Sequence, residues 1–291
     1  MIEVQNLTKD YGHGKGVFDL SLTIPQGEVF GFLGPNGAGK TTTIRNLMGF
    51  INPTKGKCTI QGIDCTLKRE EVMKKVGYIP GEIAFFDSIR GDHFIQFIAE
   101  MRHLKDLSYC HQILEMFDLN PKMKIKRMSK GMKQKLGIAL AFMHDPEVLI
   151  LDEPTSGLDP LMQRLFNELI MNEKDKGKTI LMSSHSFEEI EKTCSRVGFI
   201  KDGKLAAIEL MENVKHGKKN SYTIYFATSE EAEKFKINGG FDIMDIEDKQ
   251  VRISLSGKVN GLIQTLSQYD VIDIQSEKGS LEELFMPYYG G

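Results

Sequence analysis

A glycine-rich segment near the N-terminus has the residue types and the spacing of a phosphate-binding loop. It reads GFLGPNGAGKTTT and fits G-x-x-x-x-G-K-[ST] between a predicted strand and a predicted helix. Glycines let successive backbone N–H groups curl around phosphate oxygens, and the N-terminus of the following helix adds partial positive charge. The alternative is a structural turn with a solvated lysine. The candidate nucleotide-binding residues are Gly34, Pro35, Asn36, Gly37, Ala38, Gly39, Lys40, Thr41 and Thr42.

Three side chains of this segment have distinct predicted roles. We expect Lys40 to neutralise the β and γ phosphates of a nucleotide. We expect Thr41 to bind Mg²⁺ and Thr42 to hydrogen-bond a neighbouring phosphate. The segment therefore predicts a site for a nucleoside triphosphate with Mg²⁺.

Two acidic residues follow the apolar run VLIL, in the segment VLILDEP. Asp152, at the end of a predicted buried strand, can hold Mg²⁺ through water, and Glu153 can act as the general base for an attacking water. A helix cap before Pro154 is the alternative use of this pair. The phosphate-binding loop upstream favours the nucleotide chemistry.

A histidine ends a third apolar run, ILMSSH. His185 can hydrogen-bond the γ-phosphate or the attacking water, whereas a histidine without such neighbours would be an ordinary surface residue. Lys40, Glu153 and His185 are therefore the predicted catalytic residues.

The elements that must position these residues follow an α/β pattern. From residue 2 to about 207 short apolar runs alternate with helical patterns, which is typical of a largely parallel sheet. Runs at 28–34, 147–154 and 178–185 predict buried strands. A hairpin is expected over 199–207, with Asp-Gly at its turn.

Charge, glycine and asparagine interrupt the apolar pattern at residues 212–221, where we place a domain boundary. Beyond it the pattern β-α-β-β-α-β predicts a small α+β module, and a capping box at Ser280 and Glu283 predicts a last helix. The predicted organisation is an ATPase domain over 1–211 with a helical subdomain at about 83–145, a linker over 212–220, and a C-terminal α+β accessory or regulatory domain over 221–291.

Composition argues against some partners and sites. The 291 residues carry a net charge of −3, from 37 basic and 40 acidic side chains that are interspersed, so no electrostatic footprint for nucleic acid is expected. The 4 cysteines form no C-x-x-C pair, which argues against a disulfide framework and a zinc site. No apolar run approaches the length of a membrane span.

The motifs together, over about residues 2–210, resemble the ATP-binding cassette (ABC) family, the nucleotide-binding subunits that drive membrane transporters. GPNGAGKTT is similar to the P-loop, LILDEP to the magnesium and base strand, and SSH to the histidine switch. The resemblance implies a P-loop cassette with a parallel-sheet core, an antiparallel N-terminal sheet and a helical subdomain. It also implies that Tyr11 stacks on adenine; a tyrosine packed beside a turn is the alternative.

Two further segments resemble the parts of the family that face a second subunit. Ser156, Gly157, Leu158 and Asp159 match its dimer loop. Ser129, Lys130, Gly131 and Met132 stand where its LSGGQ signature binds the γ-phosphate held by the other subunit, so the resemblance implies a cassette dimer. Lysine replaces the first glycine of that signature and methionine its glutamine. From the residues alone, Ser129 is expected to cap a helix.

The loop that couples to the membrane subunit also departs from the family pattern. Gly81 stands where the family carries a glutamine that reaches Mg²⁺ and senses the membrane subunit. Glu82 is the substitute ligand that we consider, and coupling through the backbone of the loop is the alternative. We expect residues 81–87 to contact the permease. Phe94, Phe97, Ile98 and Met101 form one face of a helix and are expected to be core.

The resemblance implies an ATP-binding and ATP-hydrolysing subunit, expected as a homodimer peripheral on the inner face of the cell membrane through a separate permease. The loop and signature variants, with the single cassette and the C-terminal extension, resemble bacterial exporters for antibiotics and other substrates. A soluble cassette ATPase that acts on ribosomes or DNA is the alternative, and a P-loop kinase is a third hypothesis that leaves the signature unexplained.

Overall fold

The computed structural model describes residues 1–216, 220–255 and 258–277. The chain divides into two units, Met1–Met211 and Glu212–Gly291. None of the helices within the described ranges could span a lipid bilayer, because each is too short or too polar.

A six-stranded sheet forms the centre of the first unit, in the order β10-β9-β3-β8-β7-β6. Strands β9, β3, β8, β7 and β6 are parallel, and β10 is antiparallel to β9. Every residue of β3, β7 and β8 is buried, which explains their continuous apolar sequences and confirms the predicted parallel core. The strands are β3 (Val29–Leu33), β6 (Val76–Ile79), β7 (Val148–Asp152), β8 (Thr179–Ser184), β9 (Arg196–Lys201) and β10 (Lys204–Leu210).

A second, antiparallel sheet packs against the first through a shared core. Its order is β2-β1-β4-β5, which agrees with the expected N-terminal sheet. Ile2, Leu20, Phe32 and Ile44 are fully buried in this core. The strands are β1 (Ile2–Asp10), β2 (Gly16–Ile24), β4 (Lys55–Ile60) and β5 (Ile63–Asp64), and the adjoining helices are α1 (Lys40–Leu47) and α2 (Arg69–Lys75).

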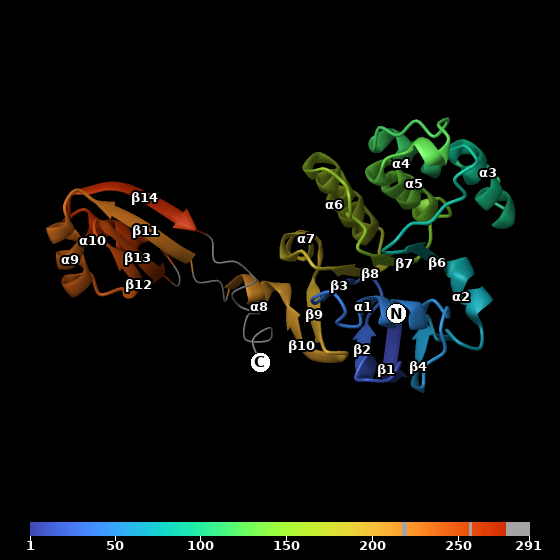
Figure 1. The fold of residues 1–291 in the computed structure, drawn as a ribbon, viewed down its shortest axis with the longest axis horizontal. Helices are drawn as coiled ribbons and strands as arrows, with labels where there is room; N and C mark the ends of the chain where they lie inside the picture. The colour runs from blue at the N-terminus through green and yellow to red at the C-terminus, as the bar shows by residue number, and fades with distance from the viewer. Residues whose placement is uncertain (217–219, 256–257, 278–291) are drawn as a thin grey trace. The chain divides into compact units, whose positions relative to one another are not determined.

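The helices between β6 and β7 gather at one end of the first unit (Figure 1). They are α3 (Gly91–Met101), α4 (Ser108–Met116), a 3₁₀ turn (Ile125–Arg127) and α5 (Lys130–Phe142). The prediction that one face of α3 is core was wrong for Phe97 and Met101, which are 46% and 64% exposed, whereas Phe94 is buried. The apolar stripe of α3 is wider than the surface that its neighbours cover.

Two helices flank the strands that carry the predicted catalytic residues. They are α6 (Pro160–Asp175), between β7 and β8, and α7 (Phe187–Thr193), between β8 and β9. Helix α7 therefore begins two residues after His185.

Within the described parts of residues 220–277, the second unit forms a small four-stranded antiparallel sheet with helices α9 and α10, in the expected order β-α-β-β-α-β. Phe226 and Phe235 pack against each other in its core, with ring centroids 5.2 Å apart and the ring planes tilted by 41°. A short helix, α8 (Met211–His216), occupies part of the expected linker, and the helix predicted from Ser280 lies outside the described residues. The elements are β11 (Asn220–Phe226), α9 (Ser229–Asn238), β12 (Asp242–Glu247), β13 (Gln250–Leu255), α10 (Asn260–Leu266) and β14 (Val271–Glu277).

Candidate functional site

The glycine-rich loop joins β3 to α1, and the side chain of Lys40 folds back to hydrogen-bond the loop backbone. Lys40 Nζ donates to the carbonyl oxygens of Gly34 (2.6 Å) and Pro35 (3.3 Å), and its side chain is only 6% exposed. Gly39 has φ = 112°, and a Cβ there would lie 2.9 Å from Val17 Cγ2. Only glycine fits at that position, so close packing against β2 constrains the loop at Gly39.

A cavity of about 1020 Å³ brings together most of the predicted residues. Gly34 does not line the cavity but contacts Lys40, which does. The predicted residues that lie outside the lining of the cavity are Ser129, Gly131, Met132 and residues 157–159 of the dimer loop. The predicted residues that line it are Tyr11, Pro35, Asn36, Gly37, Ala38, Gly39, Lys40, Thr41, Thr42, Glu82, Lys130, Asp152, Glu153, Ser156 and His185.

Asp152 and Thr41 meet at the base of this cavity. Asp152 is fully buried at the end of β7, and its Oδ2 accepts from Thr41 Oγ1 at 2.8 Å. A carboxylate and a hydroxyl are the hard oxygen donors that Mg²⁺ prefers, so the pair fits this ion. Gly81 lies beside them, since a Cβ there would be 3.2 Å from Asp152 Oδ2. Glu82 is exposed on the cavity wall.

Glu153 lies between a lysine and a histidine. Its Oε1 is 3.6 Å from Lys40 Nζ, and its Oε2 is 2.6 Å from His185 Nδ1. The backbone of Glu153 has φ = 49°, a left-handed conformation that is uncommon for this residue type and is often found at functional sites. Strands β7 and β8 are hydrogen-bonded neighbours, which explains why residues 32 positions apart meet.

Ser183 contacts both acidic residues, through the carboxylate of Asp152 and the backbone of Glu153, and was missed by the sequence analysis. Its hydroxyl donates to Asp152 Oδ1 and accepts from the backbone N–H of Glu153 (3.2 Å). The residue is fully buried in β8. A serine within an otherwise apolar run is the signal that could have identified it.

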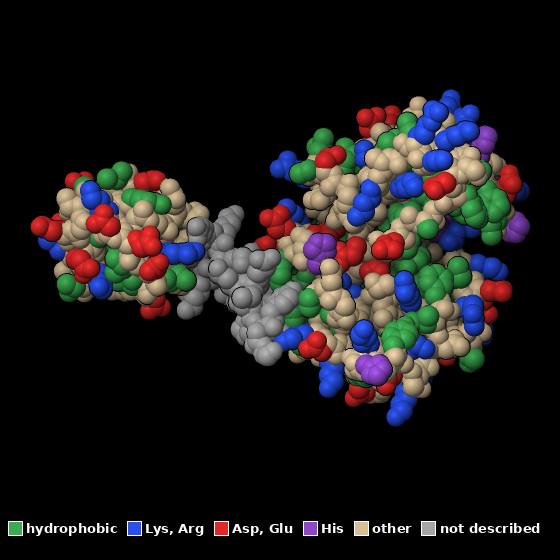
Figure 2. Space-filling model, in the orientation of Figure 1, with side chains coloured by type: hydrophobic (Ala, Val, Ile, Leu, Met, Phe, Trp, Pro, Cys, Tyr) green, Lys and Arg blue, Asp and Glu red, His purple; other side chains and the backbone are tan. Residues whose placement is uncertain are grey.

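The segment that resembles the signature begins α5 and packs on the dimer loop of the same chain. Ser129 Oγ accepts from the N–H of Met132 (3.2 Å), which confirms the predicted cap. Lys130 Nζ donates to Ser156 Oγ at 2.9 Å, and a Cβ on Gly131 would lie 2.7 Å from the oxygen of Gly157. Glycine is therefore required at residue 131. Figure 2 shows several Lys and Arg side chains on this helical part of the molecule.

The rest of the dimer loop leads into α6. Leu158 is 7% exposed, and Asp159 Oδ1 accepts from the N–H of Met162 at 3.0 Å, so Asp159 caps the helix. Ser156 is the residue of this loop that reaches the cavity.

Tyr11 lies at the edge of the cavity and is 54% exposed. Its backbone N–H donates to the oxygen of Lys15 (2.9 Å), and Lys9 Nζ lies 5.5 Å from the ring centroid. The exposed ring is available for stacking, which disfavours the alternative of a packed tyrosine.

The hairpin turn between β9 and β10 also reaches the phosphate-binding loop. Gly203 donates through its N–H to Ala38 O (3.0 Å) and accepts at its carbonyl from the N–H of Phe18 (2.8 Å). Nothing in the local sequence indicated this contact, because the partners are far apart along the chain.

Tyr78 also lines the nucleotide cavity and was not predicted from the sequence. Burial raises its pKa to about 12, with a further contribution from the charge of Asp152.

A smaller, apolar cavity of about 210 Å³ lies beside the expected coupling loop. Ile83, Ala84 and Phe85 contribute to it from the loop, and Phe94 and Ile98 contribute from α3. The loop and one face of α3 thus share a hollow.

Comparison with known proteins agrees with this geometry. The profile described as "ABC transporter" matches residues 17–156. The bacitracin transport ATP-binding protein BcrA of Bacillus licheniformis is 36% identical, over 100% of this chain and 98% of its own. The linearmycin resistance ATP-binding protein LnrL of Bacillus subtilis (strain 168) is 29% identical, again over 100% of this chain and 98% of its own. A solved structure titled "Structure of ATP binding subunit of ABC transporter" has a TM-score of 0.68 and 28% identity, over 74% of this chain and 92% of that one.

Proposed function

The chain belongs to the ATP-binding cassette transporter family, and on this premise we propose that it hydrolyses ATP to drive a separate membrane permease that exports its substrate. Members of this family bind ATP. The observation that carries the proposal is the position of Glu153, held between Lys40 and His185 at the cavity that also contains Thr41 and Asp152.

We assign the reaction to these side chains. The oxygen of a water attacks the γ-phosphorus while Glu153 accepts its proton, and the bond from phosphorus to the β-phosphate oxygen breaks to leave ADP. Lys40 carries part of the charge that develops on the phosphates, and His185 orients Glu153 and the γ-phosphate. Mg²⁺ on Thr41 and Asp152 would neutralise further phosphate charge, and Glu82 is the additional ligand that we consider.

The remaining cavity residues hold the nucleotide. Backbone groups of residues 34–39 and the start of α1 cradle the phosphates, with Thr42 beside them. The exposed ring of Tyr11 stacks on adenine.

We propose that two copies of the chain close head to tail around two ATP molecules. Supporting this, Ser129, Gly131 and Met132 do not line the cavity of their own chain, although they belong to a cassette signature. In this arrangement they bind the γ-phosphate on the second copy, and residues 156–159 lie at the dimer contact.

A membrane permease is the proposed partner. The hollow formed by residues 83–85 and α3, with exposed Phe97 and Met101, fits an apolar helix from such a chain. The cassette would then be peripheral on the inner face of the cell membrane. Two relatives that match over nearly their whole length are named for bacitracin transport and linearmycin resistance, which supports export. The second unit would have an accessory or regulatory role. The alternative of an ATPase acting on ribosomes or DNA is not favoured by these relatives.

Purification of the tagged chain from gently solubilised membranes of its host tests this function. We expect one stoichiometric polytopic protein to co-purify and the complex to hydrolyse ATP. Recovery with ribosomes or DNA-repair proteins, and without a membrane chain, would contradict the proposal.

A further inference from the structure

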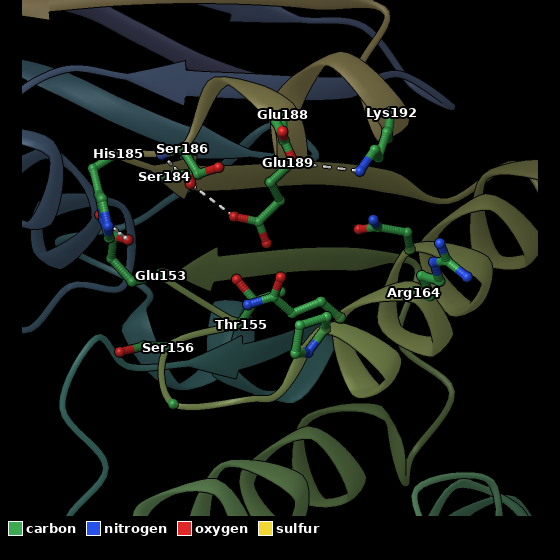
Figure 3. A pocket seen from close by; sticks show the side chains of 14 residues that line it. Glu153, Thr155, Ser156, Arg164, Ser184, His185, Ser186, Glu188, Glu189 and Lys192 are labelled. Atoms are coloured by element: carbon green, nitrogen blue, oxygen red, sulfur yellow. Dashed lines mark hydrogen bonds and ion pairs between the residues drawn. The ribbon is translucent and has the colours of Figure 1, made fainter.

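A second cavity lies on the other side of the Glu153–His185 pair (Figure 3). Its volume is about 470 Å³, and it shares Glu153, His185 and Ser156 with the nucleotide cavity. Helix α7 forms one wall, and from it the side chain of Glu189 extends toward Thr155. None of the family motifs accounts for this glutamate.

Glu189 is a buried acid bonded to the segment that carries His185. Its side chain is 7% exposed, and its Oε2 accepts from Ser184 Oγ at 2.7 Å. The same Ser184 oxygen accepts from the N–H of Ser186 at 2.9 Å. The contact therefore fixes the residues on both sides of His185.

His185 needs such support, because its own side chain is 67% exposed and packing does not hold it. Its contact with Glu153, 2.6 Å from Nδ1 to Oε2, depends on where the backbone of residues 184–186 lies. Hydrogen bonds that fix this backbone therefore fix the position of His185, and through it the orientation of the Glu153 carboxylate.

The environment of Glu189 suits an uncharged hydrogen-bonding group. Burial raises the pKa of its carboxyl and the charge of Glu153 raises it further, whereas the hydroxyls of Ser184 and Thr155 and the charge of His185 lower it; the net direction is upward. Its Oε1 is buried without a hydrogen-bond partner among the described residues, as expected where a full charge is disfavoured. Arg164 of α6, with Glu188 and Lys192 of α7, also lines this cavity.

We propose that Glu189 is a positioning residue for ATP hydrolysis, which through Ser184 holds His185 in contact with Glu153. The inference rests on the proposed ATPase function. It assigns to α7 the support of the catalytic pair, a role that acts by hydrogen bonding and needs no negative charge.

Two substitutions at one position separate hydrogen bonding from charge. Glu189→Leu removes the contacts with little change in size, and we expect kcat for ATP to fall at least about tenfold while KM changes less than about twofold, since Lys40 and its loop are untouched. Glu189→Gln keeps an acceptor for Ser184, so its kcat should stay within about threefold of wild type. Glu188→Gln, the same change on an exposed neighbour, is the matched control.

A third variant covers the case in which Glu189→Leu fails to fold, as judged by its thermal melt. Ser184→Ala removes the same contact from the other side, and its kcat should fall similarly with KM retained. Glu189→Leu added to it should cost little more, because coupled residues are not additive.

The outcomes separate this inference from the function on which it rests. A wild-type chain, alone or with its permease, that does not hydrolyse ATP contradicts the proposed function. A wild-type ATPase with unaffected Ser184→Ala and Glu189→Leu variants contradicts the inference alone. Equal impairment of Glu189→Gln and Glu189→Leu also overturns it, because the charge would then matter.

Discussion

At the scale of single residues, the site is built from groups that restrain one another. Ser183 hydrogen-bonds Asp152 and the backbone of Glu153, and the ammonium group of Lys40 donates to a carbonyl oxygen of the phosphate-binding loop. Such preorganisation lets polar groups stabilise a developing charge without first rearranging. The left-handed backbone of Glu153 is part of it, since it turns this side chain from the strand toward Lys40 and His185.

Replacement of the general base tests this arrangement. Glu153→Gln should lower the rate of ATP hydrolysis by about 10²- to 10⁴-fold, since the amide cannot accept the proton, while ATP still binds. The unhydrolysed ATP should trap a dimer that is visible by sedimentation. Glu168→Gln, an exposed glutamate on α6, is the control. A Glu153→Gln chain that is monomeric at saturating ATP would argue against the two-chain mechanism.

At the scale of elements, a buried ionic cluster joins the helical end of the first unit to the main sheet. Glu173, near the end of α6, is fully buried and bonded to Lys178, to Lys176 (2.6 Å) and to the hydroxyl of Tyr109 (2.5 Å). Tyr109 belongs to α4, and Lys178 also pairs with Asp145 before β7. The carboxylate of Glu173 thus connects α6 with α4 and with the segment before β8.

Removal of the buried lysine should destabilise the first unit. Lys178→Met leaves the charge of Glu173 with less compensation, and we expect a loss of about 3 kcal/mol in the free energy of unfolding. Chemical denaturation measures the effect. Lys174→Met, on the same helix as Glu173, is the comparison. A loss no larger than that of the comparison would show that Lys176 and Tyr109 satisfy Glu173 without Lys178.

The same cluster predicts a pH dependence of stability. Burial raises the pKa of Glu173, but hydrogen bonds from Lys176, Lys178 and Tyr109 lower it to a net value below 4.5. A carboxyl whose pKa is lower in the folded state stabilises the fold above its unfolded pKa, and this contribution is lost as pH falls. The free energy of unfolding should therefore decrease below about pH 4.5, and less so in Glu173→Gln, as measured by urea titrations across pH. An equal acid slope in both proteins would exclude Glu173 as a source.

At the scale of the whole molecule, two units have separate cores. One core joins the two sheets of the first unit, and the other gathers Phe226, Phe235 and their neighbours in the second. The residues proposed to bind and hydrolyse ATP all lie in the first unit. Catalysis within the chain and any regulation by the second unit are therefore separable.

A fragment of residues 1–216 should fold alone and bind ATP. It keeps the whole of the first unit, including the bond from the N–H of Met211 to Ser195 O (2.9 Å). Calorimetry should show one cooperative transition for the fragment, near one of the transitions of the full chain. An unfolded fragment would show that the first unit depends on residues beyond 216.

The sequence by itself determined the motifs and the periodicity of this protein. The phosphate-binding loop, Asp152, Glu153 and His185 were predicted because each lies in a short motif whose residues are close together in the chain, and the parallel core was predicted because its strands are largely apolar. Only the tertiary structure decided which distant residues support them. Ser183 and Gly203 were not found from the sequence, because their partners meet only once β8 lies beside β7 and the hairpin turn reaches the loop. Glu189 is only five residues from its partner Ser184, but the contact forms only because α7 begins directly after β8 and turns this side chain back toward the strand end. The order of strands in a sheet depends on long-range packing, which no local pattern encodes.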